Sequence, residues 1–308
     1  MILITNLNTT IDKTHIVPHY KLNGVFRPQE TIKVGGGKGI NVARVLNKLK
    51  ISCTVIGFLG GINTRSVKEN FKKEKINFIS IPIKGNSRDI TIVVDPVHRS
   101  ETVINEQGPA ISTKEQRIFL QKFSSLIKRS HYLVLCGSQP PGLPLDFYGQ
   151  LIYLSKRNKV FTILDTSGPP LRKSICSGPD LIKSNKNEFL YLIDQKRISF
   201  KRQTKDLLKK KISFIILTMG KKGCLGFDGK EWLRVMAPGI KKVSTVGSGD
   251  AFTAGLIFSF IKKYDFKQSL VFSTAVAAAN ALKIGAGNLD VSDIRALLPR
   301  VRSRALRT

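Results

Sequence analysis

The residues best suited to chemistry lie between Thr245 and Gly255, where the sequence reads Thr-Val-Gly-Ser-Gly-Asp-Ala-Phe-Thr-Ala-Gly. Gly247 and Gly249 can adopt backbone angles that other residues avoid, and they leave backbone N–H groups uncovered. A helix that begins directly after this turn points its positive end at the same N–H groups, and Ser248 lies between the two glycines. The pattern therefore predicts a site for a phosphate group.

Asp250 follows this anion site directly. An aspartate repels an anionic ligand, unless the reaction needs a base that removes a proton from the hydroxyl group attacking the phosphate. Aspartate is also a favoured N-cap of helices, so the motif alone leaves a structural and a catalytic role open. Phosphoryl transfer is the chemistry that would use the turn and the carboxylate together.

A second glycine-rich turn, Gly-Gly-Gly-Lys-Gly at residues 35–39, joins an expected strand to an expected helix. Glycines such as Gly36 and Gly37 let a ligand touch the backbone. Lys38 and Asn41 supply donors for hydroxyl or phosphate groups, although a flexible turn is the simpler interpretation. The segment is not a P-loop, because no Ser or Thr follows the lysine. Two such turns in one chain indicate two ligands.

Further polar residues lie where strands are expected to end. Asp12 follows the first expected strand, at the edge where parallel sheets bind ligands, and it could hold sugar hydroxyls or be a solvated turn residue. Asn185 and Glu188 are three residues apart and would share one face of a helical first turn. Their oxygens suit Mg²⁺ held mostly through water, but a helix cap with Glu at N3 predicts the same pair.

The elements that must position these residues alternate along the chain. Apolar runs expected to form strands are 2–7, 53–58, 131–136, 160–165, 181–183 and 214–219. Segments of helical period are 40–49, 65–74, 114–128, 145–156 and 204–211, with two more helices at 251–263 and 267–284. This alternation predicts an α/β fold with a mainly parallel sheet that is covered by helices on both faces.

Two segments, about 9–34 and 77–105, break this alternation because they read as strands without helices between them. We expect them to pair into a small sheet that projects from the main body as a lid. The remaining sequence contains no linker, so the prediction is a single domain over 1–308.

Composition limits the class of protein. Hydrophobic residues at 42% and charged residues at 23% are ordinary for a soluble globular protein, and no apolar run approaches the ~20 residues of a membrane span. We therefore expect a cytoplasmic protein.

The net charge of +30 suggests nucleic acid as a partner, but the basic residues are scattered along the chain. Only the tail with Arg300, Arg302, Arg304 and Arg307 resembles a basic arm, so a field that attracts small anionic substrates is the preferred interpretation.

Together the motifs resemble the PfkB, or ribokinase-like, family of sugar kinases over nearly the whole chain. The N-terminal family signature matches residues 36–44 and the C-terminal signature matches 245–255. Between them lie Ser-x-Pro-Pro-Gly at 138–142 and Asn-x-x-Glu at 185–188, in the order that the family shows. The resemblance implies a three-layer α/β/α domain with a small β-sheet lid, and a homodimer formed through that lid.

The resemblance also implies a role for each motif, with ATP and Mg²⁺ as nucleotide and metal. Asp250 would be the base, and the amides of Gly247, Ser248 and Gly249 would form the anion hole. The phosphosugar would be bound by Asp12, Gly36, Gly37, Lys38, Asn41, Arg88 and Ser138, with Arg88 on its existing phosphate. The nucleotide side would comprise Lys183, Asn185, Thr218, Gly220, Gly223 and Asn280, with Asn185 and Glu188 toward the metal and Asn280 in the adenine pocket.

The segment Gly-Ile-Asn-Val-Ala-Arg at 39–44 is similar to the branch that acts on phosphorylated hexoses. Fructose 1-phosphate is the first expected substrate and tagatose 6-phosphate the second, with fructose 6-phosphate as a further alternative. Asp89-Ile90 follows Arg88 where the family typically has an Asn, which removes one expected sugar contact. A kinase for a free sugar or nucleoside, and a non-catalytic binding protein on the same fold, remain the competing hypotheses.

Overall fold

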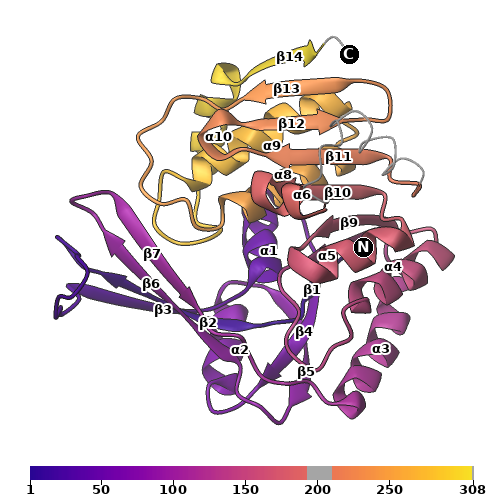
Figure 1. The fold of residues 1–308 in the computed structure, drawn as a ribbon, viewed down its shortest axis with the longest axis horizontal. Coiled ribbons are helices and arrows are strands. Elements are labelled where there is room, and N and C mark those ends of the chain that lie inside the picture. Colours follow the sequence, from indigo (N-terminus) through magenta and orange to yellow (C-terminus); the bar gives the residue numbers. More distant parts are fainter. Residues whose placement is uncertain (193–209, 307–308) are drawn as a thin grey trace.

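The computed structural model describes residues 1–192 and 210–306. Within these ranges ten strands form one sheet in the order β14-β13-β12-β11-β10-β9-β8-β1-β4-β5 (Figure 1). The parallel strands are β1 (Ile2–Asn6), β4 (Thr54–Gly60), β5 (Asn77–Ile83), β8 (Tyr132–Cys136), β9 (Phe161–Asp165), β10 (Leu181–Asn185) and β11 (Phe214–Thr218). The antiparallel strands are β12 (Cys224–Phe227), β13 (Trp232–Met236) and β14 (Arg302–Leu306). The mainly parallel sheet is thus confirmed.

Helices cover both faces of this sheet and bury two separate apolar clusters. One cluster includes side chains of α1 (Lys38–Lys48), α2 (Thr64–Lys73), α8 (Ser248–Ile261), α9 (Phe266–Asn280) and α10 (Val291–Leu297). The other includes side chains of α3 (Thr113–Ile127), α4 (Phe147–Arg157), α5 (Gly168–Ser174) and α6 (Lys186–Leu192). The predicted three-layer α/β/α arrangement is therefore confirmed.

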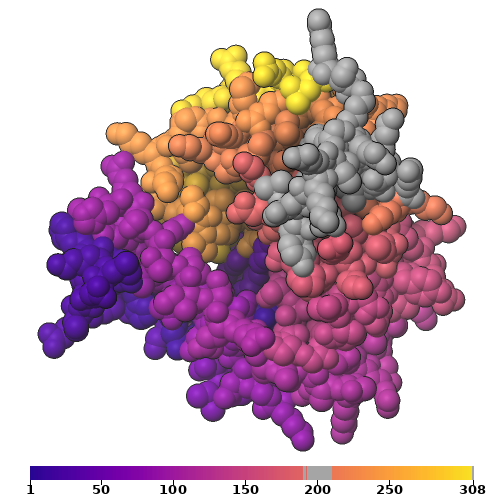
Figure 2. Space-filling view, in the orientation of Figure 1, coloured from indigo at the N-terminus to yellow at the C-terminus, as the bar shows by residue number. Residues whose placement is uncertain are grey.

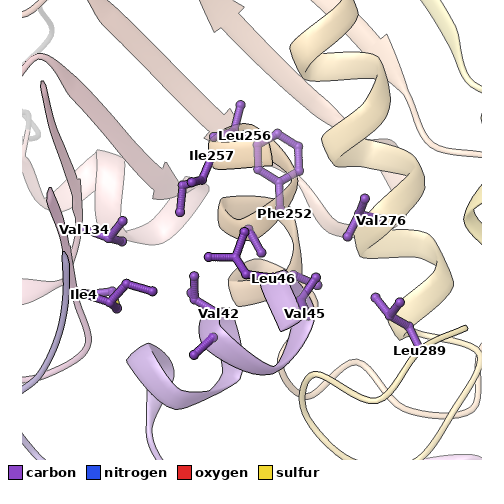
Figure 3. Packing of buried hydrophobic residues seen from close by; sticks show 14 of the residues in the cluster. Ile4, Val42, Val45, Leu46, Val134, Phe252, Leu256, Ile257, Val276 and Leu289 are labelled. Carbon is purple, nitrogen blue, oxygen red and sulfur yellow. The ribbon is translucent and has the colours of Figure 1, made fainter. Parts of the chain in front are cut away.

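Two helices that carry the glycine motifs, α1 and α8, pack against each other on one face of the sheet (Figure 3). The contact is formed by buried apolar residues, among them Val42, Val45, Leu46, Phe252, Leu256 and Ile257. Burial of each such side chain is worth roughly 1.5–3 kcal/mol relative to exposure. This packing fixes the first turns of both helices, and hence both motifs, relative to each other.

A second sheet of four strands projects from the main body as the predicted lid (Figure 1). Its order is β3 (Glu30–Gly36), β2 (Thr10–Ile16), β6 (Arg88–Asp95) and β7 (Ser100–Asn105). The predicted lid segment 77–105 is wrong at its start, because β5 pairs with β4 in the main sheet. The β4–α2–β5 connection is an ordinary crossover between parallel strands, which the run at 77–83 alone did not reveal.

The described residues also bear on the predicted basic arm, one predicted helix and the question of a membrane span. The basic tail is not a free arm, because Arg302 and Arg304 belong to β14 and pair with β13, while Arg307 lies outside the described residues. The helix predicted at 204–211 also lies outside them, apart from its last two residues, which form a turn. None of the helices in the described ranges is long and apolar enough to span a membrane.

Candidate active site

The two glycine motifs meet at the first turns of α1 and α8. Asn41 Nδ2 donates to Asp250 Oδ2 at 2.8 Å, although the two residues are 209 positions apart in the chain. The other carboxylate oxygen of Asp250, Oδ1, lies 3.9 Å from Lys38 Nζ. Asp250 is only 4% exposed, so this contact forms in the interior rather than at an open surface. The predicted base therefore touches the predicted sugar-binding residues.

A buried carboxylate that the sequence did not reveal, Asp165 at the end of β9, holds both lysines of the site. Its Oδ1 accepts from Lys38 Nζ at 2.9 Å and its Oδ2 accepts from Lys183 Nζ at 2.6 Å. Thr253 Oγ1 donates to the same Oδ2 at 2.9 Å. Asp165 is fully buried, so an unpaired charge there would be costly. With Asp250, the cluster contains two carboxylates and two ammonium groups.

This cluster shifts the pKa values of both aspartates in opposite directions. Burial raises the pKa of Asp250 above the usual aspartate value, and the charge of Asp165 adds to that shift while Lys38 opposes it. Burial alone would also raise the pKa of Asp165, but Lys183 and Lys38 outweigh it and hold that pKa well below its usual range. Asp165 is thus a permanent anion, and Asp250 is the more basic carboxylate.

The turn before α8 has the conformation that an anion site needs. Gly247 has a φ of 77°, and a Cβ there would lie 2.5 Å from Ala286 Cβ, so only glycine fits. The Ser248 amide donates to the Thr245 carbonyl oxygen at 3.2 Å, whereas the Gly249 amide lies in the first helical turn and has no partner within α8. Of the predicted anion hole, the Gly249 amide is therefore available as a donor, whereas the Ser248 amide is already engaged.

A cavity of about 700 Å³ lies beside this turn, and its volume is in the range of ligand-binding pockets. It is lined by the predicted nucleotide-side residues Lys183, Asn185, Glu188, Thr218, Gly220 and Gly223, and by Lys38, Ser248 and Gly249. Its remaining wall is largely apolar and includes Phe252, Ala277, Ala278 and Ala281. The small residues of α9 therefore border a slot, in addition to packing closely against α8.

The sugar-side residues Asp12 and Arg88 come from neighbouring lid strands. Asp12 is 7% exposed, accepts from Thr10 Oγ1 at 2.6 Å, and would collide with any Cβ at Gly36. Burial lowers the pKa of Arg88, although the carboxylates of Asp12 and Glu106 oppose this shift. Arg88 Nη1 donates to the Glu106 carbonyl oxygen at 2.6 Å, while its buried Nε has no partner among the described residues. A cation whose Nε has no partner among the described residues thus lies on the strand that pairs with the strand of Asp12.

The remaining sugar-side residues, Gly37 at the N-cap of α1 and Ser138 after β8, lie beside residues at or just after the end of β1. Gly37 has a φ of 117°, and a Cβ there would lie 2.3 Å from Asn6 Oδ1, so this position also requires glycine. Ser138 is exposed just after β8, and its Oγ accepts from Asn8 Nδ2 at 3.2 Å. The carboxyl edge of the sheet thus gathers these residues beside Lys38 and Asp12.

Comparison with known proteins agrees with this geometry. A family profile described as "pfkB family carbohydrate kinase" matches residues 5–293. This chain belongs to the pfkB family. A tagatose-6-phosphate kinase of Staphylococcus epidermidis is 31% identical over 296 residues, which cover 94% of this chain and 95% of the relative. The protein is therefore a carbohydrate kinase, a transferase of phosphoryl groups to an alcohol.

Solved structures share the fold. A protein of Thermotoga maritima described as "Possible 1-phosphofructokinase" superposes with a TM-score of 0.91 over 100% of both chains, at 22% identity. A ribokinase of the same organism superposes with a TM-score of 0.77 over 97% of this chain and 99% of its own, at 19% identity. The pfkB kinase described here thus has the ribokinase-like fold that the sequence predicted.

In this pfkB kinase the pair predicted to face the metal also caps a helix. The Asn185 amide donates to Glu188 Oε2 at 2.8 Å, and the Glu188 amide donates to Asn185 Oδ1 at 3.0 Å. The reciprocal cap at the start of α6 is therefore present. Both residues also line the large cavity, so one role does not exclude the other.

The structure buries one of the predicted nucleotide-side residues, Asn280. Its side chain is fully buried, donates to the Val246 carbonyl oxygen at 2.9 Å and accepts from the Gly287 amide at 2.9 Å. The cavity wall at this level is formed by neighbouring alanines instead. Asn280 therefore supports the backbone before the anion turn and is not among the residues that line the large cavity. Its role in the adenine pocket stays a prediction.

Replacing Asp165 with Asn should destabilise the fold, because Lys183 would remain buried without its ion pair. We expect a loss of roughly 3–5 kcal/mol in the free energy of unfolding, measured by urea denaturation. Asp146→Asn is the matched control, since Asp146 is exposed and its side chain makes no capping hydrogen bond. An equally small loss in both variants would contradict the role of Asp165.

Proposed function

We propose that this kinase transfers the γ-phosphoryl group of ATP to a primary hydroxyl group of a hexose phosphate. The observation that supports this most strongly is the position of Asp250. It lies at the start of α8, between the large cavity and the sugar-side residues, with Oδ2 bound by Asn41 and Oδ1 facing Lys38. A base in that position can remove a proton from an acceptor hydroxyl as it attacks the phosphate.

The other residues of the site have complementary tasks in this reaction. The Gly249 amide and the start of α8 stabilise negative charge on the transferred group, and Lys38 and Lys183 add positive charge beside it. Asn185 and Glu188 would hold Mg²⁺ through water, because oxygen donors suit this ion and the described residues contain no cluster of three or more metal-ligating side chains. Bound there, Mg²⁺ would neutralise phosphate charge.

A phosphorylated acceptor is proposed because of Arg88. Its Nε has no partner among the residues that the structure describes, and its strand neighbours that of Asp12, so the guanidinium suits an anionic group beside sugar hydroxyls. The similarity to a tagatose-6-phosphate kinase supports tagatose 6-phosphate, while fructose 1-phosphate is the first substrate expected from the sequence. Both are ketohexose monophosphates with a free primary hydroxyl, and we propose this class as the substrate.

We further propose a homodimer formed through the lid. The lid strands carry the partly exposed apolar residues Ile32, Val103 and Ile104, which a second copy could cover. Nucleic acid is not proposed as a partner, because Arg302 and Arg304 of the tail that most resembled a basic arm belong to β14 and pair with β13.

Asp250→Asn should preserve the shape of the site while removing the base. We expect kcat to fall by roughly 10²-fold or more, with the affinities for ATP and the hexose phosphate largely retained. Steady-state kinetics and isothermal titration calorimetry measure the two quantities. Turnover equal to that of the unchanged enzyme would refute the proposed mechanism.

The pH dependence should report the raised pKa of Asp250. The ionised carboxylate is the active form, so kcat/KM falls as pH decreases through this pKa, and the acid limb lies above the ordinary aspartate value. Lys38→Gln removes a cation that lowers this pKa, so the limb should move to higher pH even though overall activity falls. A limb that stays in place or moves to lower pH would contradict the assignment of the base.

Release of ADP should be measured with tagatose 6-phosphate, fructose 1-phosphate, fructose 6-phosphate, free hexoses and nucleosides. We expect turnover with a ketohexose monophosphate, and we expect Arg88→Ala to raise KM for that substrate by roughly 10- to 100-fold while leaving KM for ATP nearly unchanged. Preference for a free hexose or a nucleoside, or equal effects on both KM values, would refute the phosphosugar assignment.

A further inference from the structure

The far end of the lid is bound to the chain segment that leads into the anion turn. Glu101 of β7 accepts from Ser244 Oγ at 2.7 Å, from the Thr245 amide at 3.0 Å and from Thr245 Oγ1 at 2.5 Å. Figure 1 shows this end of the lid beside the orange segment between β13 and α8, and Figure 2 shows the two surfaces close together above a hollow. A single carboxylate thus joins elements that are far apart in the sequence.

The residues that Glu101 binds are connected directly to the anion turn. The Val246 amide donates to Ser244 Oγ at 3.2 Å, and the Ser248 amide donates to the Thr245 carbonyl oxygen at 3.2 Å. Thr245 lines the large nucleotide-side cavity. The position of Glu101 therefore influences the backbone that enters the predicted anion hole.

The same residues also border the sugar side. A second cavity of about 520 Å³ lies under the lid and is lined by Ser244, Val246 and Asp12. In the lid, Glu101 pairs with Val94 of β6, the strand that begins with Arg88. The hydrogen-bonded ladder of β6 and β7 thus connects Glu101 to the strand that carries the predicted phosphate clamp.

The contact between Glu101 and residues 244–245 depends on the charge of the carboxylate. A carboxylate that accepts three hydrogen bonds is charge-assisted at each of them, and two of the three donors come from one residue, Thr245. The carboxylate can make all three bonds only when residues 244 and 245 present their donors together. The lid end and the anion turn therefore favour one joint arrangement over independent positions.

We propose that Glu101 is a positioning residue that couples the position of the lid over the acceptor to the conformation of the nucleotide-side turn. This inference depends on the proposed function, because it assigns the acceptor to the lid side and the phosphoryl donor to the large cavity. Its consequence is less hydrolysis of the phosphoryl donor. Water reaches the donor less often when the lid and the turn are held together, so the phosphoryl group is transferred to the sugar.

Glu101→Gln keeps the size of the side chain but removes its charge and one acceptor. We expect the ratio of ADP formed to sugar product formed to rise, and KM for the hexose phosphate to increase by about 10-fold or more. Glu30→Gln is the matched control, since Glu30 is an exposed carboxylate at the start of β3 in the same lid. It should leave both quantities unchanged.

Thr245→Val removes the Oγ1 donor, and its effect on the ADP ratio should not add to that of Glu101→Gln, because both changes break the same contact. Fully additive effects would contradict the proposal.

Hydrogen–deuterium exchange of the substrate-free enzyme supplies a readout that does not depend on the substrate. In Glu101→Gln, exchange should accelerate in residues 100–105 and 244–248 together. An unchanged ADP ratio, or faster exchange in only one of the two segments, would overturn the coupling role. A native enzyme that phosphorylates no sugar in the panel would refute the proposed function instead, so the two failures are distinguishable.

Discussion

The site depends on one buried carboxylate, Asp165, that is shared by two cations. Lys183 is buried, and its charge is tolerable only because Asp165 lies 2.6 Å away. Lys38 binds the other oxygen of the same carboxylate and so reaches Asp250. Removing any one of these charges leaves another unbalanced, which makes the cluster a mutual constraint on the ends of β9, β10, α1 and α8. The balance between the two carboxylates and the two ammonium groups allows Asp250 to stay buried and still ionise, as the proposed base must.

The fold produces the cluster through ordinary packing. Parallel strands bring β9 and β10 to the same edge with Asp165 and Lys183 at or near their ends, and the apolar contact between α1 and α8 brings Asn41 to Asp250. The lid strands contribute Asp12 and Arg88 from a separate sheet. Rigid elements thus hold the chemical groups, and the lid contact at Glu101 connects the two halves of the site.

Short sequence patterns predicted the strands, the glycine turns and the helix starts, because each of these depends on residues that are close together in the chain. The six predicted strands all occur, and the glycine turns and Asp250 were recognised because turn chemistry and helix starts leave signatures within a few residues. The role of Asp165 could not be predicted, because its partner Lys38 is 127 positions away and no short sequence pattern indicates the pair. The same reason explains Glu101, whose partners are 143 and 144 positions distant. The motif at Asn280 does not show which way its side chain points, so its bonds to the Val246 carbonyl and the Gly287 amide were not predicted.

The most direct test is a crystal structure of the enzyme with a non-hydrolysable ATP analogue and the hexose phosphate that it phosphorylates best. We expect the primary hydroxyl of the sugar within hydrogen-bond distance of Asp250 Oδ1, with the terminal phosphate of the analogue against the Gly249 amide and the sugar phosphate at Arg88. A sugar whose hydroxyl points away from Asp250, or an analogue bound outside the large cavity, would contradict the proposed chemistry.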